Sequence, residues 1–352
     1  MCKIPILPLL VLPVLLSSCA GSKTAEMAGD PTPAAMAQQS PQSGQPQSAQ
    51  PQQSSQPKQD PQPTHEASSR VKRKRRLDPV VQALPAPRSL EVLAKTPLYE
   101  FRENEVDLYL RDLHRRIGDP RARLVHLARK NLGQRYEIFC LGEFPFETHD
   151  PDPLYALDRG DCVTFAEQMY AMALSSSWDG FFSTLMRIRY KDAKIGVATR
   201  NHYTEADWNP NNAWLFTDVT DKLGAKTEPL RMTVDRARML KKQFGLEVEI
   251  ATEKFETTYV PASSIDAVSR SLEEGDIVEV VKGSGSGRWV GHVGLFVRGP
   301  NGEPHFLHST SPMVKEESLP GYAKRYKGKV FGFKFLRYKS PLSTFDFGNT
   351  KR

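Results

Sequence analysis

The chain lacks three features that would assign it to a common class. After the first residues, no stretch approaches the roughly 18 to 20 consecutive apolar residues of a membrane-spanning helix, so we expect a soluble body. It has no internal repeat. It also lacks a basic stripe: of the net charge of +7, +5 lies at or before Lys95, and only +2 remains for the rest. A nearly neutral body excludes nucleic-acid binding as the main function.

The chain begins with the features of an export signal. Lys3 precedes an apolar run over residues 4–16, and small residues follow it. This order is typical of a secretory signal peptide, which we assign to residues 1–19. The segment Leu16-Ser17-Ser18-Cys19 resembles the lipobox of bacterial lipoproteins, which implies that Cys19 is lipidated and anchors the chain to a bilayer. Ala20 after the cysteine implies a periplasm-facing lipoprotein of the outer membrane.

Residues 20–95 are expected to form a disordered tether. Most of this segment consists of Pro, Gln, Ser and Ala and has hardly an aromatic residue, so it cannot bury enough apolar surface to offset ordering. Its basic run over residues 70–76 is interpreted as a solvated segment that could touch acidic lipid or wall polymer. The remaining residues, 96–352, are predicted to form one catalytic domain.

The body combines helical and strand periodicity, with helices first and strands later. This order favours an α+β fold in which N-terminal helices pack on an antiparallel β-sheet. The helix at 234–244 is expected to have Thr233 as its N-cap and Gly245 as its stop. The other expected helices are 104–116, 121–132, 162–174 and 181–188, and the expected strands are 248–259, 277–281, 292–297, 305–307 and 330–338.

Two of the 4 cysteines lie in the body, Cys140 and Cys162. In an oxidising compartment they could form a disulfide. Cys140 has apolar neighbours, which suit a buried thiol. Cys162 follows Asp161 at the predicted start of a helix, where the helix dipole lowers the pKa of a thiol and favours the nucleophilic thiolate. A nucleophile, a disulfide and inert burial therefore all remain open for Cys162. The two cysteines lack the close spacing of a zinc site.

A thiolate nucleophile needs a base and a partner that orients the base. His292 opens one predicted strand and His308 closes the next, with a turn at residues 299–302 between them. A hairpin centred on residue 300 would place these two histidines directly opposite each other on one face, with Cβ atoms about 5 Å apart. They are the candidate base and orienting residue.

Five segments in this order resemble the NlpC superfamily of papain-like cell-wall cysteine hydrolases. They are the residues 132–136, 161–165, 275–278, 291–295 and 306–309, and they fall within a match over roughly residues 120 to 340. The finer pattern at residues 162–167, 200–203 and 207–208 resembles the N-acetylmuramoyl-L-alanine amidase-like branch. The turn before His308 is longer than in many members of the superfamily, which leaves the third catalytic role less well defined.

The resemblance implies a papain-like fold and a function in peptidoglycan hydrolysis. It implies Cys162 as nucleophile, His292 as base, His308 as orienting residue and Tyr136 as a residue lining the site, with no cofactor and no metal. The scissile bond would join N-acetylmuramic acid to L-Ala; the alternatives are a γ-D-glutamyl-diaminopimelate endopeptidase and a non-catalytic peptidoglycan-binding lipoprotein. We expect a monomer that acts on peptidoglycan or muropeptides. The candidate substrate-binding residues, whose alternative is a structural loop with a buried Trp, are Arg200, His202, Tyr203, Asp207 and Trp208.

Overall fold

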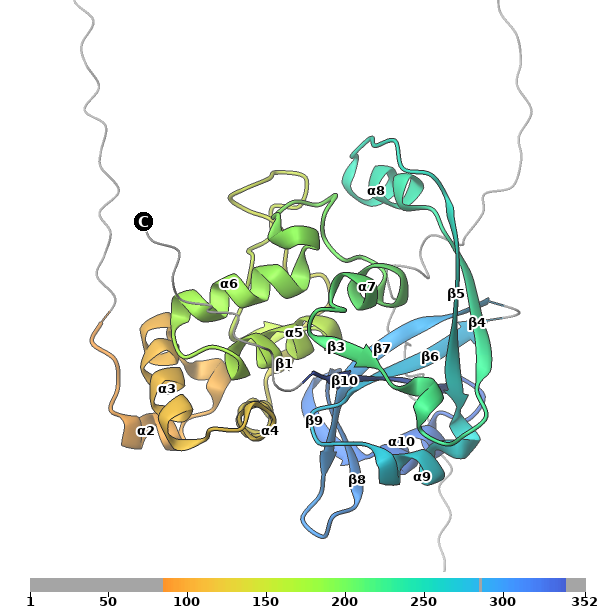
Figure 1. Ribbon diagram of the computed structural model, residues 1–352. Helices are drawn as coiled ribbons and strands as arrows, with labels where there is room; N and C mark the ends of the chain where they lie inside the picture. Colours follow the sequence, from red (N-terminus) through yellow and green to blue (C-terminus); the bar gives the residue numbers. More distant parts are fainter. Residues whose placement is uncertain (1–84, 285–286, 340–352) are drawn as a thin grey trace, which may run out of the picture.

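The computed structural model describes residues 85–284 and 287–339 (Figure 1). The expected signal peptide, the lipidated Cys19 and most of the expected tether lie outside these residues. The folded part starts earlier than residue 96, because helix α2 (Leu90–Lys95) buries Leu93 completely. Arg88 also forms an ion pair of 2.7 Å with the buried Glu105. Within the described ranges, no helix has the length and apolar character needed to cross a bilayer.

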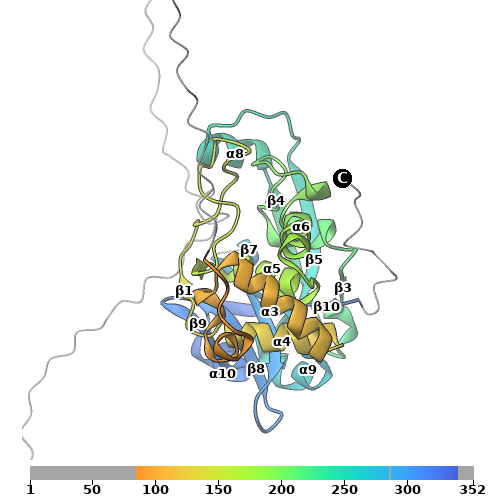
Figure 2. The ribbon, with the colours of Figure 1, turned by 90° about the vertical axis from the view of Figure 1, so that its left-hand side faces the viewer.

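Four helices form the N-terminal layer, and all four were expected within a few residues. They are α3 (Glu103–Arg116), α4 (Pro120–Lys130), α5 (Cys162–Ala173) and α6 (Trp178–Arg189). Figures 1 and 2 show them on one side of the molecule, against the sheet. Their apolar faces join the largest core cluster, in which Phe165 of α5 and Leu295 of strand β7 are fully buried. Burial of this shared face holds the layer to the sheet.

The sheet is strongly curled and mixed rather than purely antiparallel, because the short strands β1 (Arg135–Tyr136) and β2 (Arg159–Gly160) run parallel. The strand order is β2-β1-β9-β8-β7-β6-β10-β5-β4, and β3 pairs with β10. The expected strands correspond to β5 (Glu253–Pro261), β6 (Ile277–Ser284), β7 (Gly287–Arg298), β8 (Pro304–Thr310) and β10 (Val330–Tyr338). The elements without an earlier expectation include β3 (Phe216–Asp218), β4 (Glu228–Val234), β9 (Met313–Ser318) and α10 (Leu319–Arg325).

Strands β4 and β5 form an extended arm that carries α8 (Arg236–Phe244) at its end (Figure 1). The helix ends as expected at Gly245, which has a left-handed φ of 66°. The expected N-cap Thr233 was wrong. Val234 pairs with Glu253, so the strand ladder includes Thr233, and Asp235 caps α8 by accepting the Arg238 backbone N–H at 2.9 Å.

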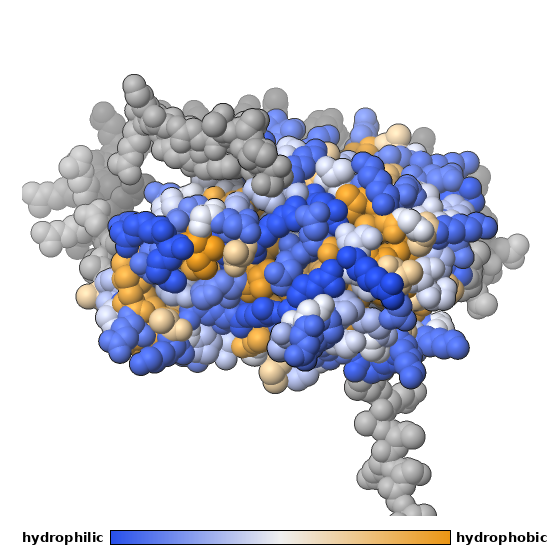
Figure 3. Space-filling model, turned by 60° about the horizontal axis from the view of Figure 1, so that its bottom comes forward, coloured by the Kyte–Doolittle hydropathy of each residue, from blue (hydrophilic) through white to orange (hydrophobic). Residues whose placement is uncertain are grey.

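The outer surface of the described residues is mainly polar. Figure 3 shows small apolar patches separated by charged side chains on the face that comes forward in that view. The three larger core clusters lie between the helical layer and the sheet, inside the curl of the sheet beside α10, and beneath α8. The fold thus leaves helix α5 and strands β7 and β8 next to one another.

Candidate active site

Cys162 is the first residue of α5. The helix starts there because Asp161 forms a capping box: its carboxylate accepts the Thr164 backbone N–H at 2.8 Å, and the Thr164 hydroxyl accepts the Asp161 N–H at 2.8 Å. Cys162 is partly exposed and its sulfur is not in a disulfide. The sequence therefore correctly located this residue at a helix N-terminus.

Nor is the sulfur of Cys140 in a disulfide, so the two cysteines of the body are not bonded to each other. Its side chain packs with Leu141 and Ala156. Burial raises the pKa of the Cys140 thiol to about 12. This thiol stays protonated at neutral pH, which agrees with the inert role that its apolar neighbours suggested.

His292 and His308 lie within hydrogen-bonding distance, but the expected register was wrong. His292 Nε2 lies 2.6 Å from His308 Nδ1, and their rings meet edge to face. Leu295 pairs with Leu307, so the hairpin is centred on residue 301 rather than 300 and His308 lies opposite Gly294. The two histidines are diagonal neighbours on one face. The hairpin loop is longer than expected, so His308 lies opposite Gly294 instead of His292. This shift of the partner position is two residues, and both histidine side chains therefore stay on the same face.

Glu317 extends this pair on the adjacent strand β9 and was not identified from the sequence. His308 Nε2 lies 3.0 Å from Glu317 Oε1. A carboxylate can only accept, so His308 donates from Nε2 and its Nδ1 must accept the proton of His292 Nε2. This assignment leaves Nδ1 of His292 unprotonated and able to act as a base. No local signal marked it, because β9 (Met-Val-Lys-Glu-Glu-Ser) lacks an apolar alternation and was not predicted as a strand.

Both imidazoles are neutral at neutral pH. His292 is 5% exposed and His308 is 1% exposed. Burial, His308 and the nearby Lys282 and Lys315 lower the pKa of His292 well below its ordinary value of 6.5. Burial also lowers the pKa of His308, and Lys315 and Arg325 add to this effect. The contact between His308 and Glu317 is therefore a hydrogen bond from a neutral ring.

Two cationic side chains form ion pairs with the Glu317 carboxylate and hold it next to His308. Lys315 Nζ lies 3.1 Å from Glu317 Oε1, and Arg325 of α10 also forms an ion pair with this carboxylate. The Glu317 side chain is 15% exposed. Ionic partners on two elements restrict its rotamers and therefore fix the direction from which it accepts the hydrogen bond.

The N-terminus of α5 is tied to the strand that carries His308. The hydroxyl of Ser309, the residue after His308, donates to the Gly160 carbonyl at 2.9 Å. Tyr136 pairs with Gly160 in the parallel β1–β2 ladder. Both contacts involve Gly160, which lies two positions before Cys162. The structure thus gathers Cys162, Tyr136 and the histidine strand around one point of the chain.

Side chains of the candidate substrate-binding loop form hydrogen bonds with carboxylates of the protein itself. Trp208 is 3% exposed, and its indole N–H donates to Glu167 at 2.9 Å. It is therefore a core residue rather than a surface platform for a sugar, which is the structural alternative raised above. Arg200 donates to Glu143 at 3.1 Å and to Asp150 at 2.9 Å.

Of the other three candidates of this loop, two form hydrogen bonds within the protein and one lines a cavity. Asp207 accepts the Tyr203 backbone N–H at 3.0 Å and a hydrogen bond from Arg236 at 2.7 Å. His202 contacts the Val197 carbonyl at 2.7 Å, and burial lowers its pKa to about 3. Tyr203 alone lines a cavity, which lies beside α8.

Across the described ranges, no group of three or more His, Cys, Asp or Glu side chains is arranged to hold a metal ion.

Comparisons with known proteins found similar solved structures and one matching family. A protein of Legionella pneumophila is similar in structure, with a TM-score of 0.58 and 21% identity over 67% of this chain and 95% of that one. An N-acetylmuramoyl-L-alanine amidase from Bacteroides uniformis gives a TM-score of 0.48 and 24% identity over 62% of this chain and 99% of that one. No curated protein matches the chain. The N-acetylmuramoyl-L-alanine amidase-like family matches residues 126–328. This match spans more than half of the chain and includes Cys162, His292, His308 and Glu317, so the chain belongs to the N-acetylmuramoyl-L-alanine amidase-like family.

Proposed function

We propose that this protein is a cysteine amidase that hydrolyses peptidoglycan at the bond between N-acetylmuramic acid and L-Ala. The observation that carries the proposal is the hydrogen-bonded series His292–His308–Glu317. It leaves a basic imidazole nitrogen on the sheet to which the N-terminus of α5 is tied. Membership in the amidase-like family supports the choice of bond. On this proposal the fold is a papain-like, NlpC-type fold.

In the proposed reaction, His292 Nδ1 removes the proton of the Cys162 thiol as the sulfur attacks the carbonyl carbon of the lactyl amide. The positive end of the α5 dipole favours the developing negative charge. The C–N bond then breaks, and His292 returns its proton to the leaving amine of L-Ala. Water attacks the resulting thioester with His292 again as base, which releases the muramoyl carboxylate and restores the thiol.

Glu317 acts as a positioning residue in this scheme. Its carboxylate selects the tautomer of His308, and His308 in turn holds His292 with Nδ1 unprotonated. A carboxylate behind an imidazole also stabilises the imidazolium that forms during proton transfer. The buried His308 thus transmits the effect of Glu317 without meeting the substrate.

The location of the protein is part of the proposal. The signal peptide, the lipid-bearing Cys19 and the tether would place the domain on the periplasmic face of the outer membrane, within reach of peptidoglycan. The protein would act there as a monomer. These features lie outside the described residues and depend on the sequence patterns alone.

The test is incubation of the full chain with purified muropeptides, followed by mass measurement of the products. We expect release of the intact stem peptide from the sugar, and a Cys162→Ser variant should lose this activity. Cys140→Ala is the matched control and should retain it. Products cut between γ-D-glutamate and diaminopimelate would instead identify the endopeptidase, and equal activity in wild type and Cys162→Ser would refute a cysteine mechanism. Binding of muropeptide without any cleavage would identify a wall-binding protein.

A further inference from the structure

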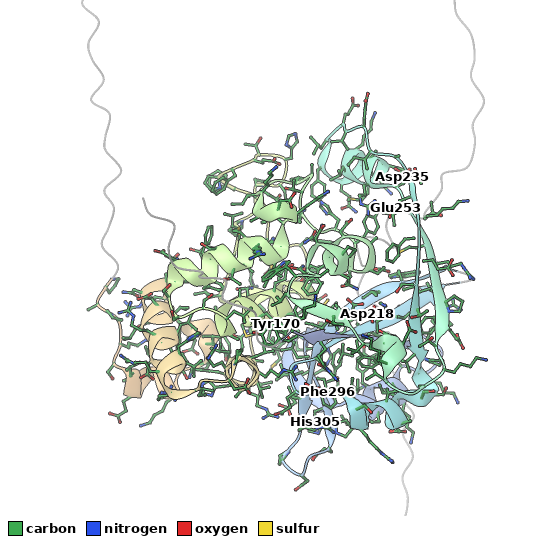
Figure 4. All side chains as sticks on the ribbon, viewed as in Figure 1. Tyr170, Asp218, Asp235, Glu253, Phe296 and His305 are labelled. Carbon is green, nitrogen blue, oxygen red and sulfur yellow. The ribbon has the colours of Figure 1, made fainter. Side chains whose placement is uncertain are left out.

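A cavity of about 630 Å³ lies apart from the histidine pair, between the β4–β5 arm, α8 and the start of β7. Figure 4 labels Asp235 and Glu253 where β4 passes into α8 and β5 begins, and Asp235 is one of the residues that line the cavity. This volume is typical of sites that bind a small ligand or a short peptide segment. None of the expectations from the sequence assigned a role to this arm.

The charge of the cavity favours an anion. Five basic and two acidic side chains line it. Arg231 is paired with Glu256 at 2.8 Å, and the Asp235 carboxylate is used to cap α8. Within the described part of the chain, Arg238 and Lys254 have no carboxylate within ion-pair distance. No ion pair within residues 85–284 and 287–339 offsets these two charges, so an anionic ligand would gain from both.

The cavity also has an apolar side and an unused hydrogen-bond donor. Phe255, Met239 and Trp289 line it. The indole N–H of Trp289 is shielded from solvent and has no acceptor among the described residues. A buried donor without a partner is costly, so a turn of this side chain toward a ligand carbonyl or carboxylate in the cavity would remove that cost.

The cavity is connected to the candidate active site by strand β7. Trp289 lies three residues before His292 on this strand. The strand is bulged between these positions, which pair with Lys282 and Val280, two residues apart on β6. At about 3.3 Å per residue they lie roughly 7 Å apart, a distance that two or three extended peptide residues span. Glu205 of the neighbouring π-helix accepts the Val290 backbone N–H at 2.8 Å, between these two positions, and fixes the path of the strand.

We propose that this cavity binds the carboxylate-bearing stem peptide of peptidoglycan while the muramoyl end lies at Cys162. This inference rests on the proposed function and adds the part of the substrate that the enzyme recognises. Arg238 and Lys254 pair with stem carboxylates, Phe255 contacts the aliphatic parts, and Trp289 donates to a peptide oxygen. The occupant is thus an acidic peptide rather than a glycan.

The test measures binding rather than turnover. The Cys162→Ser variant of the full chain is titrated calorimetrically with a muropeptide that carries free stem carboxylates. Adding Arg238→Gln and Lys254→Gln should weaken binding at least tenfold. The matched control adds Lys241→Gln and Arg270→Gln, which remove two exposed charges that do not line the cavity, and should leave binding unchanged. A muropeptide with amidated carboxylates should bind the starting protein about as weakly as the free muropeptide binds the double cavity variant.

The outcomes separate this inference from the proposed function. Equal affinity of the cavity and control variants would overturn the cavity assignment even if wild type cleaves muropeptides. Loss of affinity only in the cavity variant would support it even if no cleavage is found. Retained muropeptide affinity in the cavity variant, with weakened binding to vesicles of anionic lipid, would assign the cavity to lipid and refute the peptide.

Discussion

Two strand pairs of the same sheet, β7–β8 and β4–β5, differ in how deeply their side chains are buried. β7 and β8 are covered on both faces, and eight consecutive residues of β7, from Val290 to Val297, are buried. β4 and β5 form an arm in which buried positions are few, and basic side chains remain exposed. The buried pair holds two imidazoles in one geometry, whereas the arm displays charge. Precise proton transfer needs the first arrangement, and recognition of a flexible acidic peptide tolerates the second.

The largest expected effect comes from the histidine series. His292→Ala should abolish hydrolysis because it removes the base. Glu317→Gln keeps the size of the side chain but removes its charge, and we expect a loss of about 10- to 100-fold in kcat by analogy with other supporting residues. Steady-state kinetics on muropeptides tests both. The control is His305→Gln, which changes another histidine of β8. His305 contacts Glu316 at 2.9 Å instead of the series, so this variant should retain activity.

The pH profile separates a positioning role of Glu317 from a merely structural one. Because the pKa of His292 is lowered well below the ordinary value of 6.5, wild-type activity should persist below pH 6.5 rather than fall near it. Loss of the Glu317 charge should move the acid limb to still lower pH, since a negative charge nearby favours the imidazolium. An unchanged acid limb with reduced thermal stability would indicate only a structural contribution.

A smaller effect should follow from adding one methyl group beside His308. A Cβ at Gly294 would lie 2.5 Å from a Phe306 ring carbon and 2.7 Å from the His308 Cβ. Gly294→Ala must therefore push β8 away, and overpacking of this kind costs about 1 to 3 kcal/mol. We expect lower thermal stability together with reduced kcat. The control is Gly118→Ala, which has no atom within 4 Å of the new Cβ; equal behaviour of the two variants would contradict the tight packing of this pair.

A pH-dependent change in stability should come from the buried carboxyl groups beside β7. Burial raises the pKa of Glu279 to about 8 and that of Glu205 to about 7. A raised pKa in the folded state means that the fold binds more protons, so stability is lost as the pH rises from about 4.5 to 8, by up to about 1.4 kcal/mol per unit and group. The lowered pKa values of the buried His292 and His308 have the opposite effect: they reduce the stability of the fold as the pH falls below 6.5.

Glu279→Gln tests this assignment because it is neutral at every pH and keeps an oxygen for the contact with Asn209. Melting temperatures between pH 6.5 and 8 should decline in wild type and decline less in the variant. A parallel decline in both proteins would exclude Glu279 as the group responsible. Glu256→Gln on the exposed arm is the matched control and should follow wild type.

The smallest effect is expected on the arm itself. Arg231 and Glu256 are 66% and 60% exposed, and such pairs contribute little because water and salt screen them. Arg231→Gln should therefore leave the melting temperature unchanged at physiological salt. A clear drop would show that the arm depends on ionic contacts, and the contrast between the two strand pairs would then fail.

Local patterns predicted the elements better than their pairing. The apolar periodicity of α3, α4 and α5 identified these helices within two residues at each end, because each buries one face against the core. β4 was missed although Leu230, Met232 and Val234 alternate with exposed polar residues, because its last two residues were assigned to the start of the following helix. α8 was expected to start at 234, but Val234 belongs to the β4 ladder, and pairing with Glu253 decides this.

The sequence by itself determined the types of group at the candidate site: a cysteine at a helix N-terminus and two histidines on one face of a pair of adjacent strands. These follow from local rules, since a cap starts a helix and a period of two keeps residues on one side. Only the tertiary structure decided that His292 and His308 are diagonal, that Glu317 completes the series and that Trp208 is buried. Each of these depends on strand register or on packing between distant segments, and no local pattern specifies which residues meet across a sheet.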